Sequence, residues 1–210
     1  MRIVRVGEFA WLVELAQGDE TPARLAARLQ TWHHPAVLGI TPAACSVLVE
    51  LDAAAGQLPD GDALLVALLG SDEKVAGLPM PPQPARRHSI SVRYNGADLA
   101  EVAHHAGLSV DAVIARHAGA LYRVAFLGFQ PGFAYLRGLD PTLVLPRHAT
   151  PRTRVPPGSV AIAEGWAGIY PASTPGGWRL LGRTELSLFD ASSAEPALLQ
   201  PGDEVEFTPW

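Results

Sequence analysis

Arginine dominates the basic side chains of one segment, residues 137–183. The segment contains six arginines and only two acids, whereas residues 190–206 contain five acids and no base. The six are Arg137, Arg147, Arg152, Arg154, Arg179 and Arg183. A guanidinium group offers N–H donors in a fixed planar fork, which suits a carboxylate or a phosphate. Glycine turns in the same segment leave backbone N–H groups free to face an anion. The pattern predicts an anion-binding site, and surface pairing with the acidic segment is the alternative for any single arginine.

His117 and two tyrosines are the candidates for proton transfer and for oxyanion stabilisation. Histidine ordinarily titrates near neutrality, so His117 is the best candidate for a general acid or base. Its alternative role is to complement the dipole at the C-terminal end of a helix. Tyr122 and Tyr170 carry hydroxyl groups that could donate to an oxyanion. The competing interpretation is a half-buried tyrosine whose hydroxyl is already satisfied.

Two glycine-containing loops could bring backbone and small polar groups close to a ligand. Residues 128–133 combine two glycines, a proline and two phenylalanines, and Gln130 is the one polar side chain among them. The second loop contains Thr174, Gly176 and Gly177, for which a plain hairpin turn is the alternative. The chain has no GxxxxGK[ST] or GxGxxG motif and no Cys/His cluster with metal-ligand spacing. Cys45 is expected to lie in an apolar strand as inert core.

Composition limits the class of protein. The net charge of −5 argues against general binding of nucleic acid, and the longest apolar run, about residues 63–69, is far too short to span a membrane. One cysteine cannot form an internal disulfide, and the N-terminus resembles no signal peptide. We therefore expect a soluble cytoplasmic protein. The 20 Gly and 19 Pro make up about 19% of the chain, against an average near 12%, which disfavours a helical bundle.

A proline cluster at residues 79–84 predicts a linker over 79–87 between two domains, 1–78 and 88–210. In the first domain we predict strands at 2–6, 9–15, 37–41 and 45–51, and helices beginning at Thr21-Pro22 and spanning 62–78. In the second we predict a strand at 89–94, then helices capped by Asp98 and Ser109 and ended by Gly107 and His117. Short strands follow at 121–129, 160–163, 168–170, 178–181, 186–189 and 205–208. Many short strands at this spacing indicate a barrel or a sandwich.

A series of motifs over residues 117–208 resembles one known family. It runs through FLGFQPGFAYL (126–136), PR-x3-PR (146–152), VP-x-GSV (155–160), GIYP (168–171), TPGGW (174–178) and LGRT (181–184). In this order the motifs are similar to those of the allophanate hydrolase subunit 1 / KipI family. Residues 163–167 depart from the family's usual glycine-rich stretch. His148 falls at a variable position, so the resemblance assigns it no role.

The resemblance implies an α+β protein with a small α/β N-terminal domain and a cyclophilin-like β-barrel C-terminal domain. It implies one component of an ATP-dependent 5-oxoprolinase, inactive alone, which converts 5-oxoproline to glutamate. Its implied partners are a homologous-fold C-type subunit (the KipA or allophanate hydrolase subunit 2 type) and the A-type subunit of 5-oxoprolinase. ATP, with Mg²⁺, would be bound mainly with the partner. The alternatives are an inhibitor of a histidine kinase and a carboxyltransferase component of a urea or allophanate system.

Combined with the chemistry above, this gives a set of predicted site residues. The predicted catalytic residues are His117, Tyr122 and Arg152. The predicted substrate- or anion-binding residues are Gln130, Arg147, Arg154, Tyr170, Thr174, Gly176, Gly177 and Arg183. We expect no metal ligands, no nucleic acid and no membrane among the interactions of the chain.

Overall fold

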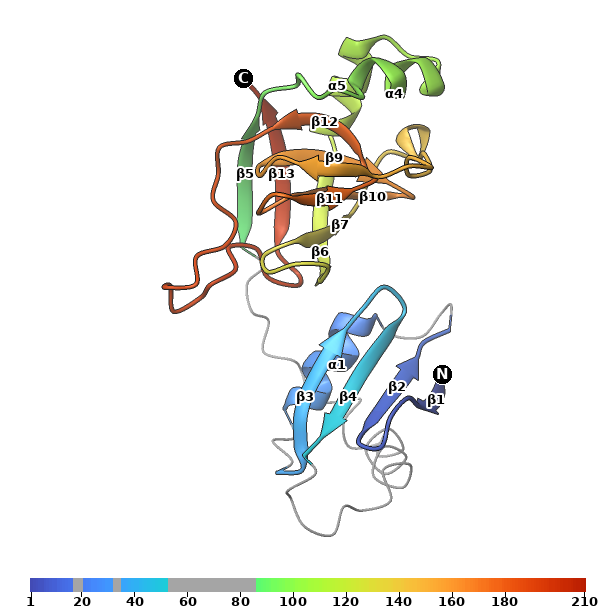
Figure 1. Cartoon of the computed structure of the whole chain (residues 1–210), viewed down its shortest axis with the longest axis vertical. Coiled ribbons are helices and arrows are strands. Elements are labelled where there is room, and N and C mark those ends of the chain that lie inside the picture. The colour runs from blue at the N-terminus through green and yellow to red at the C-terminus, as the bar shows by residue number, and fades with distance from the viewer. Residues whose placement is uncertain (17–20, 32–34, 53–85) are drawn as a thin grey trace. The chain divides into compact units, whose positions relative to one another are not determined.

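The chain divides into two compact units, Met1–Pro84 and Ala85–Trp210 (Figure 1). The computed structural model describes residues 1–16, 21–31, 35–52 and 86–210. The predicted helix 62–78 and nearly all of the predicted linker 79–87 lie outside the described residues. Among those described, no helix has both the length and the apolar character that crossing a membrane requires.

The N-terminal unit is a four-stranded antiparallel sheet with one helix. The strands β1 (Arg2–Arg5), β2 (Ala10–Glu14), β3 (Val37–Pro42) and β4 (Ser46–Leu51) lie in the order β1-β2-β4-β3, and the helix is α1 (Pro22–Gln30). As predicted, the Thr21 hydroxyl caps α1 by accepting from the Arg24 N–H, and Pro22 occupies the first turn. Leu25 and Leu29 of α1 pack in one core with the sheet. The expectation for Cys45 is wrong, because this residue is exposed in the turn before β4.

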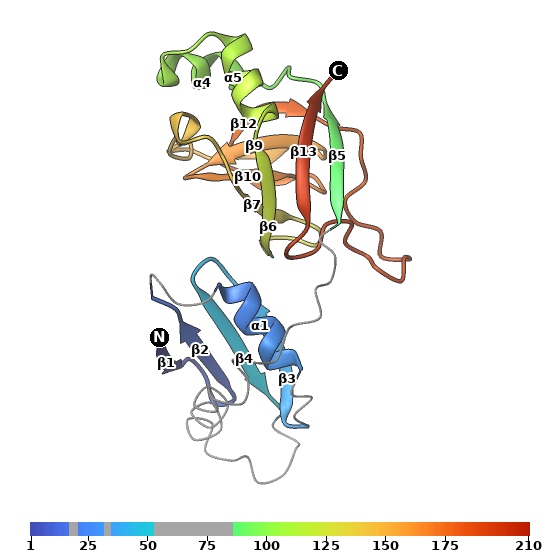
Figure 2. The same ribbon diagram turned by 180° about the vertical axis from the view of Figure 1, so that it is seen from behind.

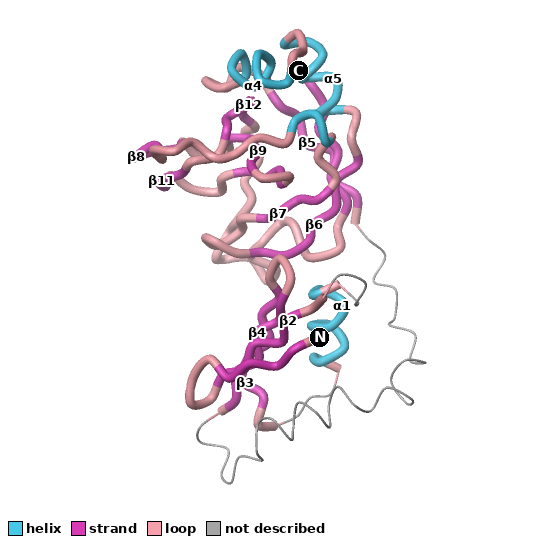
Figure 3. The backbone as a smooth tube through the Cα atoms, turned by 90° about the vertical axis from the view of Figure 1, so that its right-hand side faces the viewer, coloured by secondary structure: helices cyan, strands magenta, loops and turns pink. Residues whose placement is uncertain are grey.

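The C-terminal unit is built on a seven-stranded sheet in the order β12-β9-β10-β7-β6-β13-β5. Its strands are β5 (Arg87–Val92), β6 (Leu121–Leu127), β7 (Ala134–Arg137), β9 (Ser159–Ala163), β10 (Trp166–Ile169), β12 (Arg179–Arg183) and β13 (Glu204–Pro209). The C-terminal strand β13 lies between β6 and β5 (Figure 2). A separate ribbon pairs β8 (Arg152–Val155) with β11 (Thr174–Gly176), away from the larger sheet (Figure 3).

Backbone hydrogen bonds bring the two end strands of this sheet together. Arg93 and Arg183 exchange two bonds of 2.9 Å, and the N–H groups of Gly96 and Asp98 donate to the carbonyls of Leu181 and Leu180 at 3.0 and 3.1 Å. We call this junction of β5 with β12 the seam. It makes the sheet a nearly closed barrel, and together with the N-terminal unit it confirms the predicted α+β fold class.

Two helices lie together at the end of the barrel where β12 and the C-terminus lie (Figure 1). They are α4 (Leu99–Ala106) and α5 (Val110–Ala118), both close to their predicted bounds. The Ser109 hydroxyl caps α5 by accepting from the Ala112 N–H, as predicted. Asp98 occupies the predicted N-cap position of α4, but its side chain makes no capping bond to the helix.

In the second domain, six of the predicted strands are confirmed, and they correspond to β5, β6, β9, β10, β12 and β13. The predicted strand 186–189 is wrong, since this stretch is a loop with one isolated bridge between Phe189 and Ala197. The sequence pattern also missed β7, β8 and β11. These strands have three or four residues, and proline or glycine stands within or beside them. Pairing with distant strands, rather than local preference, makes them extended.

The seam allows a test of barrel closure at Gly96. A Cβ atom there would lie 2.2 Å from the Leu180 carbonyl oxygen, so alanine must push the two backbones apart. We expect Gly96→Ala to lower the free energy of unfolding by about 1–3 kcal/mol. Gly128→Ala is the matched control, because its new methyl group meets only ordinary contacts of 3.7 Å or more. Urea unfolding that shows equal stability for both variants would contradict a tightly closed seam.

Candidate functional site

The arginines of the predicted anion site do not stand alone, because two of them pair with acids of the α4 region. Arg152 begins β8, and its Nη2 lies 2.5 Å from Oδ1 of Asp98. Arg179 begins β12, and its Nη1 lies 2.6 Å from Oε1 of Glu101. Asp98 is only 3% exposed and Arg179 only 7%. The structure therefore builds a network of alternating charge where β8, β12 and α4 meet, with Asp98 and Arg179 buried and Glu101 exposed.

Asp98 is the centre of this network. Its Oδ2 accepts the Leu180 N–H at 2.7 Å, and its Oδ1 accepts from Arg152 and from His148, whose Nε2 lies 3.2 Å away. Burial by itself opposes ionisation of this carboxyl. The hydrogen bonds from Arg152, Leu180 and His148 outweigh burial and hold the pKa of Asp98 below its usual value. Asp98 is therefore a carboxylate that binds three chain segments together.

His148, to which the sequence assigned no role, belongs to the same network. Its Nδ1 lies 2.8 Å from Nη1 of Arg179. A guanidinium only donates, so Nδ1 must be the accepting nitrogen and Nε2 must carry the proton that is donated to Asp98. The result is a chain from Asp98 through His148 and Arg179 to Glu101. No sequence signal identified His148, because its partners are 31 and 50 residues away.

On β8 and in the segment before it, three arginines have N–H groups without a partner among the described residues. The Nη1 of Arg152 is buried and has no hydrogen-bond partner among the described residues. Arg147 is exposed and pairs through Nε with Glu164 at 3.0 Å. Arg154 is exposed, donates through Nε to the Ser173 hydroxyl at 3.1 Å, and has no ion pair in the part of the chain that is described. These guanidinium groups lie on β8 and the segment that leads into it.

The β11 loop lies against this arginine segment. The Gly177 carbonyl accepts the His148 N–H at 2.7 Å, and a Cβ at Gly177 would lie 3.7 Å from the Arg147 Cβ. Thr174 and Gly176 are the ends of β11 and pair with β8. The structure thus brings Thr174, Gly176 and Gly177 together with the arginines.

Tyr170 lies beneath this loop and is 1% exposed. A Cβ at Gly176 would lie 2.4 Å from the Tyr170 hydroxyl oxygen, so the loop covers the ring closely and requires glycine there. Burial raises the pKa of Tyr170, and a backbone hydrogen bond from Trp178 acts in the opposite direction. The structure does not support Tyr170 as a group that contacts substrate directly, because the hydroxyl is covered.

The structure does not support the predicted catalytic roles of His117 and Tyr122, because both side chains are buried in the core. Both have no exposed surface. The Tyr122 hydroxyl donates to the His117 carbonyl at 3.0 Å, and the Tyr94 hydroxyl meets His117 Nδ1 at 2.8 Å. The His117 ring stacks on Phe207 with centroids 4.7 Å apart. Burial lowers the pKa of His117 to about 3, so the ring is neutral and acts as core.

Gln130 and Arg183 have no hydrogen bond or ion pair with the Asp98 network among the described residues. Gln130 lies in the hairpin between β6 and β7, and its Nε2 is buried without a partner in the part of the chain that is described. The preceding residue, Phe129, has a φ of 69°, which is a left-handed backbone conformation that non-glycine residues rarely adopt. Phe129 is also 59% exposed at the tip of this hairpin. Arg183 ends β12 at the seam, with its side chain exposed.

Asp98, Glu101 and His148 place three ligand atoms within 4.8 Å of one another, as a cation site would. Each carboxylate already contacts a guanidinium group, however. A divalent cation at this position would lie beside two fixed positive charges. The donor set therefore fits an ion-pair network better than a metal centre.

The buried His117 gives a test by pH. Its pKa is about 3 in the folded chain and about 6.5 when unfolded, so protonation favours unfolding as the pH falls below 6.5. Because the unfolded chain takes up this proton and the folded chain does not, we expect His117 to make the free energy of unfolding about 2 kcal/mol lower at pH 5 than at pH 7.5. In His117→Phe, which keeps a ring against Phe207, that part of the pH dependence should disappear. Urea titrations of both proteins at the two pH values measure it, and parallel pH profiles would contradict the buried neutral ring.

Comparison with known proteins agrees with this architecture along the whole chain. Residues 1–199 match the family model described as the carboxyltransferase domain, subdomain C and D. The 5-oxoprolinase B subunit of Escherichia coli O157:H7 is 40% identical over 212 residues, which covers 99% of this chain and 95% of that protein. The 5-oxoprolinase B subunit of Haemophilus influenzae is 50% identical over 125 residues, or 58% of this chain and 59% of that protein.

Solved structures show the same fold. The protein TTHA0988 superposes with a TM-score of 0.79 at 37% identity over 96% of this chain, which spans only 40% of that longer chain. The protein PH0987 from Pyrococcus horikoshii covers 100% of this chain and 97% of its own, with a TM-score of 0.58 at 35% identity. The urea amidolyase of K. lactis, at 21% identity and a TM-score of 0.74, shares the fold. The chain therefore belongs to the family of the carboxyltransferase domain, subdomain C and D.

Proposed function

We propose that this chain is the B-type subunit of an ATP-dependent 5-oxoprolinase and works with partner subunits in the cytoplasm. The observation that carries the proposal is the likeness to the E. coli 5-oxoprolinase B subunit, which extends over nearly the full length of both chains. The proposed partners are an A-type subunit and a homologous-fold C-type subunit. The arginine segment of the barrel supports a site for the anionic groups of this reaction.

The proposed reaction takes 5-oxoproline, ATP and water to glutamate, ADP and phosphate. Transfer of the γ-phosphoryl group to the lactam oxygen would activate the ring carbonyl. Attack of water would then break the ring C–N bond and release phosphate. Both steps gather negative charge on phosphoryl and carboxyl oxygens, so they need positioned cationic donors.

Among the described residues, the arginine segment could supply those cationic donors. Arg147 and Arg154 present exposed guanidinium groups, and Asp98 fixes Arg152, whose buried Nη1 has no hydrogen-bond partner among the described residues. The candidate proton-transfer group His117 is buried. We therefore propose that ATP and its Mg²⁺ are held mainly with the partner, and that this chain is inactive alone.

Reconstitution tests the proposal directly. Purify this chain and the proposed A-type and C-type partners, and measure glutamate formation from 5-oxoproline with ATP. We expect glutamate only when all three are present, with one ATP hydrolysed for each ring opened. A complete set that forms no glutamate would reject the proposed function. Activity of this chain alone would reject the division of roles.

Single substitutions distinguish the contributions of the individual arginines to activity. Arg147→Ala and Arg154→Ala change exposed groups, so we expect stability within about 0.5 kcal/mol and kcat/KM lower by about tenfold. Arg152→Ala should lower kcat/KM by more than tenfold, and Arg152→Lys should restore only part, since lysine lacks the fork. Arg123→Ala is the control, because Arg123 is also an exposed arginine that pairs with one acid, Glu204, at 2.7 Å. Steady-state assays in which every variant behaves like Arg123→Ala would remove the anion-binding role.

A carboxyltransferase component is the second candidate function. The observation that favours it is the family model itself, together with the urea amidolyase of Saccharomyces cerevisiae, which is 35% identical over an alignment of 101 residues that covers 42% of this chain and 5% of that protein. This alternative predicts transfer of a carboxyl group from a biotinylated carrier to an amide. An assay with carboxybiotin and urea distinguishes the two, because a 5-oxoprolinase component should show no such transfer.

A further inference from the structure

The seam of the barrel is closed at one end only. Arg93 and Arg183 exchange two backbone hydrogen bonds, and the bonds of Gly96 and Asp98 continue the closure toward α4. In the other direction, within residues 86–210, no backbone hydrogen bond crosses the seam at Ser91 or Ser89. The barrel therefore retains an open strand edge along β5.

The free backbone groups of this edge point into the seam. β5 bonds to β13 through its even-numbered residues, as shown by the 3.2 Å bond from the Trp210 N–H to the Val92 carbonyl. Arg93 directs both of its backbone groups the other way, to β12. Because successive residues of a strand alternate in direction, Ser89 and Ser91 direct their N–H and C=O groups to the same side as Arg93.

The chain that could have paired with this edge turns away. The antiparallel register at the closed end places position 91 opposite position 185. The Thr184 N–H donates to the Gly158 carbonyl and so continues the pairing of β12 with the β9 side. The Leu186 N–H then donates at 3.3 Å to the hydroxyl of Thr184, in a local turn just after the end of β12. The chain turns at residues 185–186, and no backbone hydrogen bond within residues 86–210 joins it to Ser91 on this side.

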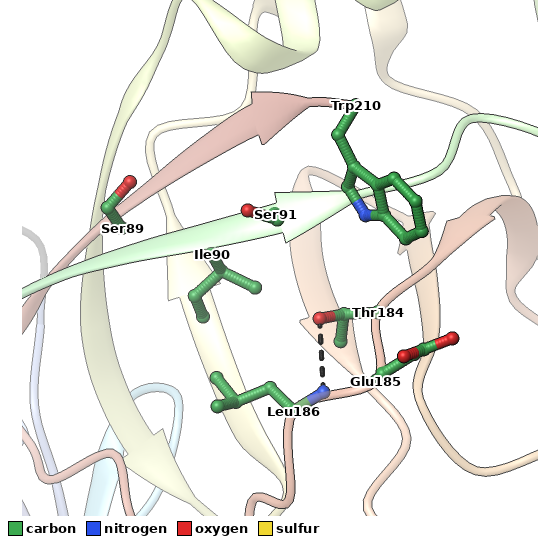
Figure 4. A pocket seen from close by; sticks show the side chains of 7 residues that line it. All are labelled: Ser89, Ile90, Ser91, Thr184, Glu185, Leu186 and Trp210. Atoms are coloured by element: carbon green, nitrogen blue, oxygen red, sulfur yellow. Dashed lines mark hydrogen bonds between the residues drawn. The ribbon is translucent and has the colours of Figure 1, made fainter.

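A hollow of about 470 Å³ lies where the partner strand is missing, with β5 on one side, residues 184–186 on the other and Trp210 at one end (Figure 4). Leu186 is 41% exposed and Trp210 is 60% exposed, and both line the hollow. Glu185, also in the lining, is exposed and has no ion pair among the described residues. The hollow therefore combines backbone groups of β5 that have no strand partner, two partly exposed apolar side chains, and one carboxylate without an ion pair among the described residues.

We propose that the open edge of β5 binds an extended segment of a partner subunit, which adds a strand to the barrel at the seam. Unpaired strand edges bind other chains through main-chain hydrogen bonds, and side-chain pockets give the specificity. The segment would place an apolar side chain against Leu186 and Trp210 and a basic side chain beside Glu185. This inference rests on the proposed function, which supplies the partner subunits.

Ser91→Pro tests the inference at a single backbone group. Proline removes the N–H that faces the hollow, and proline is tolerated at strand edges in that orientation. Ser91→Ala is the matched control, since it keeps the N–H and loses only the exposed side-chain hydroxyl, 3.4 Å from that of Thr208. Isothermal titration with the proposed A-type and C-type partners should give a Kd raised about tenfold or more for Ser91→Pro and unchanged for Ser91→Ala.

A second pair of measurements covers the case in which the proline variant unfolds. Glu185→Arg should weaken the same complex, whereas Glu185→Gln should have a smaller effect. The Ser91 amide should exchange rapidly with deuterium in the free chain and become protected in the complex. Unchanged affinity for Ser91→Pro, or no protection of the Ser91 amide in a complex that forms, overturns the inference and leaves the proposed function standing.

Two further outcomes would also overturn the assignment of this edge to a partner subunit, each for a different reason. If the wild-type chain forms no complex with those partners, the proposed function fails and the named occupant fails with it. If the chain alone is a dimer that Ser91→Pro dissociates, the edge binds a second copy and its assignment to a different partner is overturned. Light scattering of the wild-type and variant chains separates these cases.

Discussion

A single buried carboxylate, that of Asp98, holds the candidate site of this protein together. Its two oxygens accept from the β12 backbone, from Arg152 at the start of β8, and from His148 in the preceding loop. The Asp98 N–H donates to the Leu180 carbonyl as well, so one residue both closes the seam and orients the arginine. A buried charge is tolerated only when it is paired and hydrogen-bonded. The geometry of β8, β12 and α4 therefore follows from the need to satisfy Asp98.

The same barrel separates groups that look alike in the sequence. Arg152 and Arg179 are drawn inward by acids, whereas Arg147 and Arg154 stay on the surface, where an anion can reach them. Asp98 fixes one side of the Arg152 guanidinium and leaves Nη1 without a partner among the described residues. Pre-positioned donors of this kind stabilise charge without reorganisation during the reaction. The proposed anion site would therefore depend on the Asp98–Arg152 ion pair, which positions one of its arginines.

The sequence predicted most of the elements and only part of the site. Thr21-Pro22 and Ser109 predicted helix starts correctly, because their capping chemistry is local. The ordinary titration range of histidine favours a catalytic role for His117, but Phe207 and two tyrosines enclose the ring. No local pattern reveals that enclosure, since Phe207 lies 90 positions away. No local pattern reveals the role of His148 either, because that role comes from distant acidic and basic partners.

The amino-acid sequence by itself determined the division into an N-terminal part and a strand-rich C-terminal part, the approximate bounds of the described helices, and the concentration of arginine and glycine in residues 137–183. These properties depend on spacing, capping and composition, which act over a few residues. Only the tertiary structure decided which arginines pair with acids, which histidine is buried, and where the seam stays open. Those outcomes depend on desolvation and on strand pairing between residues tens of positions apart, and both are set when the barrel closes.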